Sequence, residues 1–86
     1  MSYRIEYAKS VTKDIAKISD KNLRLIFEKI ETLTSDPYPP TCKKLKGYDS
    51  LYRIRAGNYR ILYEVENDVL VVFIVEIGDR KNVYED

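Results

Sequence analysis

The sequence predicts an α+β domain in which a two-helix hairpin packs on one face of a mainly antiparallel four-stranded sheet, with the element order β-α-α-β-β-β. Apolar residues recur at helical spacing in the first half of the chain, and short alternating segments separated by turn-forming residues fill the second half. A chain of 86 residues supports one hydrophobic core, so we expect residues 1–86 to form a single domain.

The first predicted elements are a strand over residues 2–7 and a helix that follows it. Alternation in the strand places three apolar residues on one side: Tyr3, Ile5 and Tyr7. The helix is indicated by apolar residues at helical spacing: Ala8, Val11, Ile15 and Ile18. Ser10 is a candidate cap for this helix.

A second helix is predicted to begin near Ser19 or Asp20, either of which can cap it, and to end before Pro37. Its apolar residues form one stripe: Leu23, Ile26, Phe27, Ile30 and Leu33. Burying each of these side chains contributes roughly 1.5–3 kcal/mol. We therefore expect the whole stripe to lie in the core, where the two helices share one apolar side.

Residues 35–50 contain three prolines and a glycine, so they are predicted to form a connecting loop. Three strands are expected after it, at about 51–56, 59–66 and 69–77. Gly57-Asn58 and Asn67-Asp68 are the predicted turns between them. The last strand is apolar on both faces, which indicates a central position in the sheet.

The composition excludes several classes of protein. Cys42 is the single cysteine and there is no histidine, so we expect no intramolecular disulfide, no metal site and no cofactor. The longest apolar run has seven residues, whereas a membrane helix needs about 20. The N-terminus does not have the pattern of a signal peptide, so the cytoplasm is the expected compartment.

Positive charge is concentrated in the middle of the chain. Residues 43–60 carry six basic and one acidic residue, a sum of +5, whereas the formal charge of the whole chain is +1. This imbalance favours a focused anion-binding site rather than a generally basic surface. The basic residues are Lys43, Lys44, Lys46, Arg53, Arg55 and Arg60.

The predicted turn at Gly57-Asn58 determines how the two strands that carry the arginines pair. It places Arg55 opposite Arg60 and Arg53 opposite Leu62. One face of the hairpin then consists of core residues: Tyr52, Ile54, Ala56, Tyr59, Ile61, Tyr63 and Val65. The opposite face consists of Arg53, Arg55, Arg60, Leu62 and Glu64.

Like charges that face each other across two strands are destabilising. A phosphate among the guanidinium groups would reverse this effect, because each group can donate two charge-assisted hydrogen bonds. The alternative is that the arginines pair with Glu64, Glu66 or the acidic residues of the C-terminus. We interpret the face as a phosphate site, with the lysines at 43, 44 and 46 as further contacts.

Arg80 and Tyr84 follow the last predicted strand. A basic group beside an aromatic ring is typical of sites for single-stranded RNA, because the charge binds phosphate and the ring stacks on a base. The alternative is a surface charge paired with Asp79 and an aromatic residue that only packs.

The segments "KKLKG", "LYRIRAGNYRILYEV" and "VLVVFIVEIGDRKNVY" resemble the RelE/ParE superfamily of bacterial and archaeal toxins, and its RelE branch most closely. The resemblance covers nearly the whole chain. It implies the toxin of a type II toxin–antitoxin system, which binds in the ribosomal A site and cuts the mRNA there without a metal, through attack of the 2′-hydroxyl. The implied partners are the ribosome, its mRNA and a RelB-like antitoxin that covers the basic face.

The resemblance also implies roles for single residues. Arg60 would clamp the scissile phosphate, Arg80 would stabilise charge and help to protonate the leaving group, and Tyr84 would stack on a nucleotide or share in proton transfer. Arg53 and Arg55 stand where the best-known members carry lysines.

This departure leaves the general base open, because arginine stays charged. Either the protein relies on charge stabilisation and positioning alone, or Lys44, Lys46 or Tyr84 takes the proton. Two other functions also remain open: inhibition of DNA gyrase, as in ParE-type relatives, and an inactive relative that only binds the antitoxin.

A set of apolar residues is expected on the same face as the arginines if Asn67-Asp68 forms the second turn: Leu62, Val71, Phe73 and Val75. One interpretation is a second small core covered by the chain's own tail. The other is an apolar seat for a helix of the antitoxin.

Overall fold

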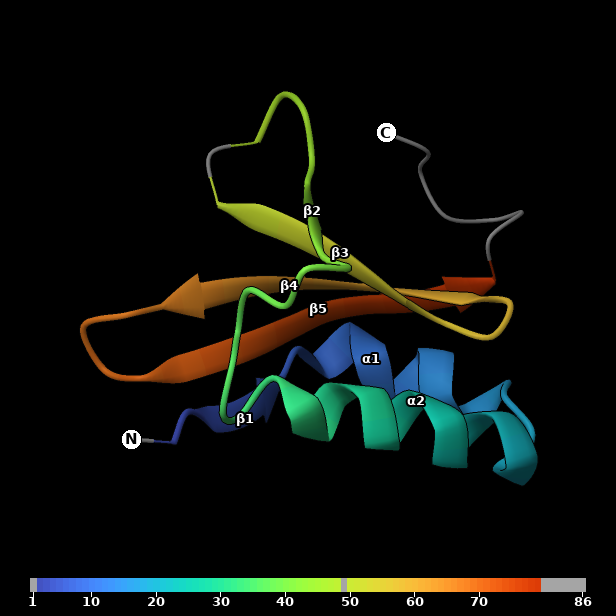
Figure 1. Cartoon of the computed structure of the whole chain (residues 1–86). Coiled ribbons are helices and arrows are strands. Elements are labelled where there is room, and N and C mark those ends of the chain that lie inside the picture. The colour runs from blue at the N-terminus through green and yellow to red at the C-terminus, as the bar shows by residue number, and fades with distance from the viewer. Residues whose placement is uncertain (1, 49, 80–86) are drawn as a thin grey trace.

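The computed structural model describes residues 2–48 and 50–79. In this part of the chain, two helices lie on one face of a five-stranded sheet (Figure 1). The predicted α+β class and the helix hairpin are confirmed. The elements in chain order are β1 (Arg4–Tyr7), α1 (Lys9–Ala16), α2 (Asp20–Thr32), β2 (Lys43–Lys44), β3 (Leu51–Ala56), β4 (Tyr59–Glu66) and β5 (Val71–Asp79).

The strand order in the sheet is β1-β5-β4-β3-β2. β1 pairs with β5 in parallel, and all other neighbours are antiparallel. The predicted interior position of the last strand is therefore confirmed, but the predicted count of four strands is wrong. β2 is the additional strand, and its two lysines carry neither the apolar nor the alternating pattern that would reveal a strand.

The two helices begin differently. The Ser19 hydroxyl accepts a hydrogen bond from the Asn22 amide at 3.4 Å, so this predicted cap of α2 is confirmed. Ser10 does not cap α1, because α1 begins at Lys9 after Ala8, with no side-chain cap. The Ala8 amide donates to the carbonyl oxygen of Ile74 at 2.9 Å. This bond ties Ala8 to the sheet, so the helix starts directly after it.

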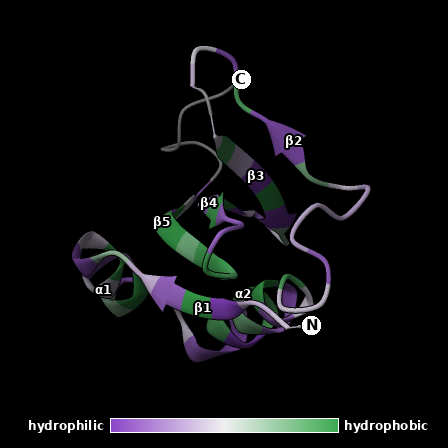
Figure 2. Ribbon diagram, turned by 90° about the vertical axis from the view of Figure 1, so that its left-hand side faces the viewer, coloured by the Kyte–Doolittle hydropathy of each residue, from purple (hydrophilic) through white to green (hydrophobic). Residues whose placement is uncertain are grey.

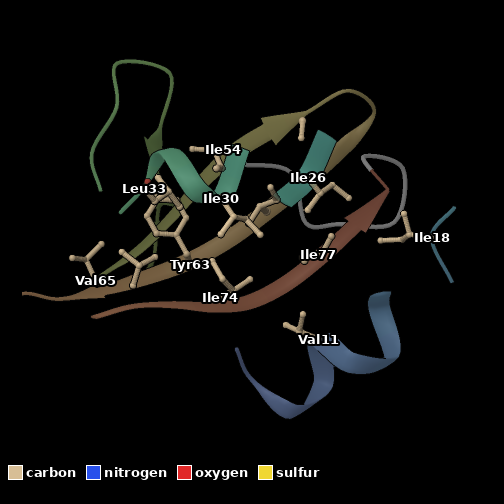
Figure 3. Packing of buried hydrophobic residues seen from close by; sticks show 13 residues of the cluster. Val11, Ile18, Ile26, Ile30, Leu33, Ile54, Tyr63, Val65, Ile74 and Ile77 are labelled. Carbon is tan, nitrogen blue, oxygen red and sulfur yellow. The ribbon is translucent and has the colours of Figure 1, made fainter. Parts of the chain in front are cut away.

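The core lies between the helices and the sheet, and side chains from both layers point into it (Figure 3). α1 packs against β5, and α2 packs against β3. Figure 2 shows that β5 is largely apolar, whereas β2 at one edge is hydrophilic and β1 at the other edge is mixed. The buried residues of the helical layer are Val11, Ile26 and Ile30 within the helices and Ile18 and Leu33 just after them, and their partners in the sheet include Ile54, Ile61, Tyr63, Ile74 and Ile77.

Phe27 is the member of the predicted stripe that does not enter the core. It remains 38% exposed, while Ile26 beside it is fully buried. Adjacent residues of a helix point about 100° apart, so the side of α2 that faces the sheet at Ile26 turns Phe27 outward. The Phe27 ring instead contacts Tyr7 of β1 edge-to-face, with ring centroids 6.4 Å apart.

Tyr63 fastens the proline-rich loop to the core. Its buried hydroxyl donates to the carbonyl oxygen of Pro37 at 2.7 Å. Burial is the main reason that the pKa of Tyr63 is raised, with a further contribution from Cys42. The hydroxyl therefore stays protonated and keeps donating. The ring stacks on Tyr52, which in turn contacts Tyr38 of the loop.

The first predicted turn is confirmed and the second is not. Gly57 has a φ of +60°, which glycine adopts without strain, and β3 and β4 pair as expected around it. Residues 67–70 form the second connection, and Leu70 in the left-handed region precedes β5. Glu66 consequently pairs with Val71, two residues further along than predicted. A shift of two residues keeps the side chains at the start of β5, up to Val75, on their expected faces.

A bulge interrupts the pairing of β4 with β5. Tyr63 pairs with Ile74 but Leu62 pairs with Glu76, so Val75 is an extra residue. The bulge turns Ile77 toward the helices, where it joins the core. β1 ends opposite Ile74, and beyond that point Asp14 of α1 accepts the Ile77 amide hydrogen bond at 3.1 Å. A helix side chain thus takes the place of the missing edge strand.

The different positions of Ile26 and Phe27 predict different costs of truncation. We expect Ile26→Ala to lower the free energy of unfolding by about 2–5 kcal/mol, because it leaves a cavity in a packed core. Phe27→Ala should cost clearly less, because its ring lies at the surface. Urea denaturation followed by circular dichroism measures both values, and equal losses would contradict the placement of the stripe.

The contact between α1 and the end of β5 gives a second prediction. Asp14→Ala should lower the free energy of unfolding by about 1–3 kcal/mol, because the partly buried Ile77 amide loses its acceptor. Asp14→Asn keeps an amide oxygen at the same place and should recover most of the loss. The assumed role of Asp14 would be wrong if the two variants were equally destabilised in the same denaturation experiment.

Candidate nucleic-acid interface

The sheet face turned away from the helices carries basic residues from three adjacent strands. Arg53 of β3 pairs with Leu62 of β4, and Arg55 pairs with Arg60, as the sequence predicts. Lys43 of β2 pairs with Arg53 on the other side. Paired residues of antiparallel strands point to the same side of a sheet. We call this set, Lys43, Arg53, Arg55 and Arg60, the basic face.

The arginines of the basic face differ in their exposure to solvent. Arg60 is fully buried and Arg53 is 7% exposed, whereas Arg55 is exposed. Burying a guanidinium group is costly unless it has interaction partners, and neither buried arginine is a free charge in this form of the protein. The sequence predicts that three guanidinium groups bind a phosphate, and only that of Arg55 is open to solvent.

Arg55 lies at the free edge of β3, because β2 pairs only with Tyr52 and Arg53. It lines a shallow groove of about 350 Å³ between α2 and the β3–β4 turn, together with Leu25 and Lys29. The long side chain therefore reaches toward the edge of the sheet.

The three predicted lysine contacts are separated by the short strand β2. Lys43 shares the face of Arg53, whereas Lys44 pairs with Tyr52 and so points to the opposite face. Lys46 is exposed in the turn that follows β2. Sequence reasoning groups the three lysines by their closeness along the chain. Only the pairing of β2 with β3 separates them.

Three described carboxylates share the outer face of the sheet with the arginines. Glu64 is half-buried and pairs with Leu51 and Phe73, Glu66 is exposed and pairs with Val71, and Glu76 is exposed and pairs with Leu62. All three belong to the side of the face formed by β4 and β5. The positive charge of the face therefore increases toward β3 and β2, where Arg53, Arg55 and Lys43 lie.

A second, smaller core forms on this outer face. Leu45 and Leu62 are buried, and Leu51 and Val75 pack against them. The residue that covers Leu62 is thus Leu45, which follows β2. Of the residues expected to seat an antitoxin helix, Leu62 and Val71 are each 5% exposed, while Phe73 and Val75 are half-buried.

Two of the expected site residues, Arg80 and Tyr84, lie outside the described residues. Gly78 pairs with Arg60 and Asp79 with Tyr59, so the end of β5 lies beside Arg60.

Within residues 2–48 and 50–79, no helix is long and apolar enough to cross a membrane. That part of the chain also contains no group of three side chains suited to a metal ion.

The fold and this face can be compared with known proteins. Residues 5–84 match the family model described as the ParE toxin of type II toxin–antitoxin systems, parDE. The chain is 36% identical to the protein RelE1 of Methanocaldococcus jannaschii over 88 residues, which covers 99% of this chain and 98% of the relative. It is 26% identical to the mRNA interferase toxin RelE of Escherichia coli K12 over 90 residues, covering 100% and 94% of the two chains.

A solved structure gives the same result. The archaeal RelE–RelB complex from Pyrococcus horikoshii OT3 contains a chain that superimposes on this one with a TM-score of 0.81 at 30% sequence identity, covering 96% of this chain and 100% of the other. Sequence and structure therefore agree that this chain belongs to the RelE/ParE superfamily of type II toxin–antitoxin toxins.

Proposed function

We propose that the protein is a ribosome-dependent mRNA endonuclease that cuts the message in the A site and so inhibits translation. The observation that carries this proposal is the placement of cations on three adjacent strands, β2, β3 and β4, on the sheet face that the helices leave uncovered. The relative from Escherichia coli that is named an mRNA interferase supports the same reading.

The spacing of the basic face suits an extended nucleic-acid strand. Alternate residues of one strand lie about 6.6 Å apart, and neighbouring strands lie about 4.8 Å apart. The first value, which separates Arg53 from Arg55, is comparable with the distance between consecutive phosphates of an extended strand. RNA that crosses the sheet from β4 to β2 would thus meet one cation after another.

The proposed reaction needs no metal. The 2′-hydroxyl of the ribose gives up its proton and its oxygen attacks the adjacent phosphorus, while the bond from phosphorus to the 5′-oxygen of the next nucleotide breaks and that oxygen takes up a proton. The products are a 2′,3′-cyclic phosphate and a 5′-hydroxyl. Arg60 and Arg53 would stabilise the charge of the phosphorane, and Arg80 would help to protonate the leaving oxygen while Tyr84 stacks on a nucleotide.

The burial of Arg60 has a consequence for this reaction. A phosphate can reach a fully buried guanidinium only when the groups around it rearrange. Arg55, Lys43 and Lys46 would therefore bind the RNA first, because Arg55 and both lysines are exposed. The free energy of binding at these outer cations would then contribute to the rearrangement that exposes Arg60.

We also propose that a RelB-like antitoxin covers the basic face and thereby inhibits the toxin. The Pyrococcus relative is a complex of RelE with RelB, and the half-buried Phe73 and Val75 offer apolar surface next to the basic residues. A ribosomal target places the protein in the cytoplasm.

Inhibition of DNA gyrase is the second candidate function, because the matching family model is that of ParE toxins. The two candidates make opposite predictions in one extract. An endonuclease leaves supercoiling unaffected and shortens ribosome-bound mRNA, whereas a gyrase inhibitor does the reverse. An inactive, antitoxin-binding relative would do neither.

The proposed role of Arg60 predicts a large loss of cleavage on substitution. We expect Arg60→Ala and Arg60→Lys each to slow cleavage of ribosome-bound mRNA by about 10²-fold, because lysine keeps the charge but cannot donate in the bidentate manner. Arg80→Ala should have an effect of similar size. Cell-free translation followed by primer extension measures the cut positions and rates.

Arg4→Ala is the matched control for these variants. Arg4 is exposed on β1, where it forms an ion pair with Glu6 at 2.9 Å, and its loss should leave cleavage unchanged. Circular dichroism establishes that each variant is folded. If folded Arg60 and Arg80 variants cut mRNA as the wild type does, the site assignment is wrong.

The pairing of β2 predicts that neighbouring lysines contribute unequally. Lys43→Ala should weaken binding of a 2′-O-methyl single-stranded RNA and reduce the slope of log K against log salt by about 0.7, the value for one phosphate contact. Lys44→Ala, on the opposite face, should change neither quantity. Fluorescence anisotropy at several salt concentrations tests this difference. Equal effects of the two substitutions would contradict the placement of Lys43 and Lys44 on opposite faces of the sheet.

A further inference from the structure

The segment between β2 and β3 rises from the sheet on the side away from the helices (Figure 1). Its base is fixed to the outer face, because Leu45 is only 2% exposed and packs against Leu62. The Leu45 amide also donates to the carbonyl oxygen of Leu51 at 2.9 Å. The described residues that follow, Lys46 to Tyr48, form a projecting tip beside the basic face.

The tip is open to solvent at Gly47. Gly47 has a φ of +84°, and a Cβ added to it would meet no atom within 4 Å. The backbone turns sharply at Gly47. The side chains of Lys46 and Tyr48 therefore do not continue the directions of the side chains of β2. Both side chains are exposed.

Tyr48 differs from the other exposed tyrosines of the described chain. Tyr7 contacts the ring of Phe27, and Tyr38 contacts the ring of Tyr52. Tyr48 is 51% exposed, and its ring contacts no other aromatic ring among residues 2–48 and 50–79. An aromatic ring with a free face, next to a lysine, has the two components of a binding site for single-stranded nucleic acid.

We propose that Tyr48 stacks on an unpaired base of the RNA while Lys46 contacts an adjacent phosphate. This inference rests on the RNA substrate of the proposed function and adds a binding subsite to it. β2 lies two strand spacings, roughly 10 Å, from β4. Leu45, where the tip begins, lies opposite Leu51, which is four residues along β3 from the partner of Arg60 and so a further ~13 Å along the strands. The base held at the tip is therefore several nucleotides away from the phosphate that Arg60 holds.

The charge around the tip favours RNA over an apolar partner surface. Residues 43–60 carry a net charge of +5. The carboxylates of the outer face, Glu64, Glu66 and Glu76, belong to β4 and β5, and of these Glu64 pairs with Leu51, whose carbonyl oxygen accepts the Leu45 amide where the tip begins. A base that leaves the stack offers an aromatic face to Tyr48, and its phosphate satisfies Lys46. Stacking is tolerant of sequence, so the subsite would position the RNA and favour bases that stack strongly.

The test measures equilibrium binding of a fluorescein-labelled, 2′-O-methyl single-stranded RNA to the full chain. We expect Tyr48→Leu, which keeps an apolar side chain but removes the ring, to bind about tenfold more weakly. Tyr48→Phe should bind like the wild type. Tyr38→Leu, an exposed tyrosine beside Tyr52 on the helix side of the sheet, is the matched control and should not change affinity. Circular dichroism confirms that all variants are folded.

RNAs that each lack one base supply the decisive comparison. For the wild type, one position should lose affinity when its base is removed, and Tyr48→Leu should lose nothing further at that position. The inference is overturned if Tyr48→Leu binds as the wild type does, if the wild type binds no RNA, or if both proteins respond equally at every position. RNA binding with this pattern but intact ribosome-bound mRNA would instead refute the proposed cleavage alone.

Discussion

The pairing of β3 with β4 through the Gly57-Asn58 turn is the constraint on which the rest of the molecule depends. Side chains alternate along a strand, so one register sends Ile54 and Ile61 to the helices and Arg53 and Arg60 to the outer face. A slip of one residue would bury the arginines under the helices and expose the isoleucines. The positive φ of Gly57 holds this register, and thereby both the core and the basic face.

The outer face combines burial with charge in an unusual way for so small a domain. Arg60 and Arg53 are buried among the strands, and Leu45 packs against Leu62 next to them. Embedding charges lowers the stability that a short chain can reach. The proposed binding of RNA would give a functional reason to keep such groups, because the sheet fixes their positions in advance.

The end of β5 is held by two features that act together. The bulge at Val75 returns Ile77 to the core, and Asp14 of α1 accepts the hydrogen bond of its amide. This contact lies next to Gly78, which pairs with Arg60. A helix on one face of the sheet therefore stabilises the strand end that lies beside the proposed site on the other face. Loss of the Asp14 carboxylate, or strain in its hydrogen bond, would therefore disturb the basic face although Asp14 makes no direct contact with RNA.

The sequence alone determined the features that depend on short-range patterns: a cap of α2 at Ser19 or Asp20, the Gly57-Asn58 turn, the pairing of Arg55 with Arg60 and the two faces of the hairpin. Each of these follows from neighbours a few residues apart, where spacing and turn chemistry leave little choice. Only the tertiary structure decided that Lys43 and Lys44 form an edge strand on opposite faces, that a bulge redirects Ile77, that Phe27 stays outside the core and that Arg60 is buried while Arg55 is not. Those outcomes depend on contacts between segments distant along the chain, so the local pattern of residues does not predict them.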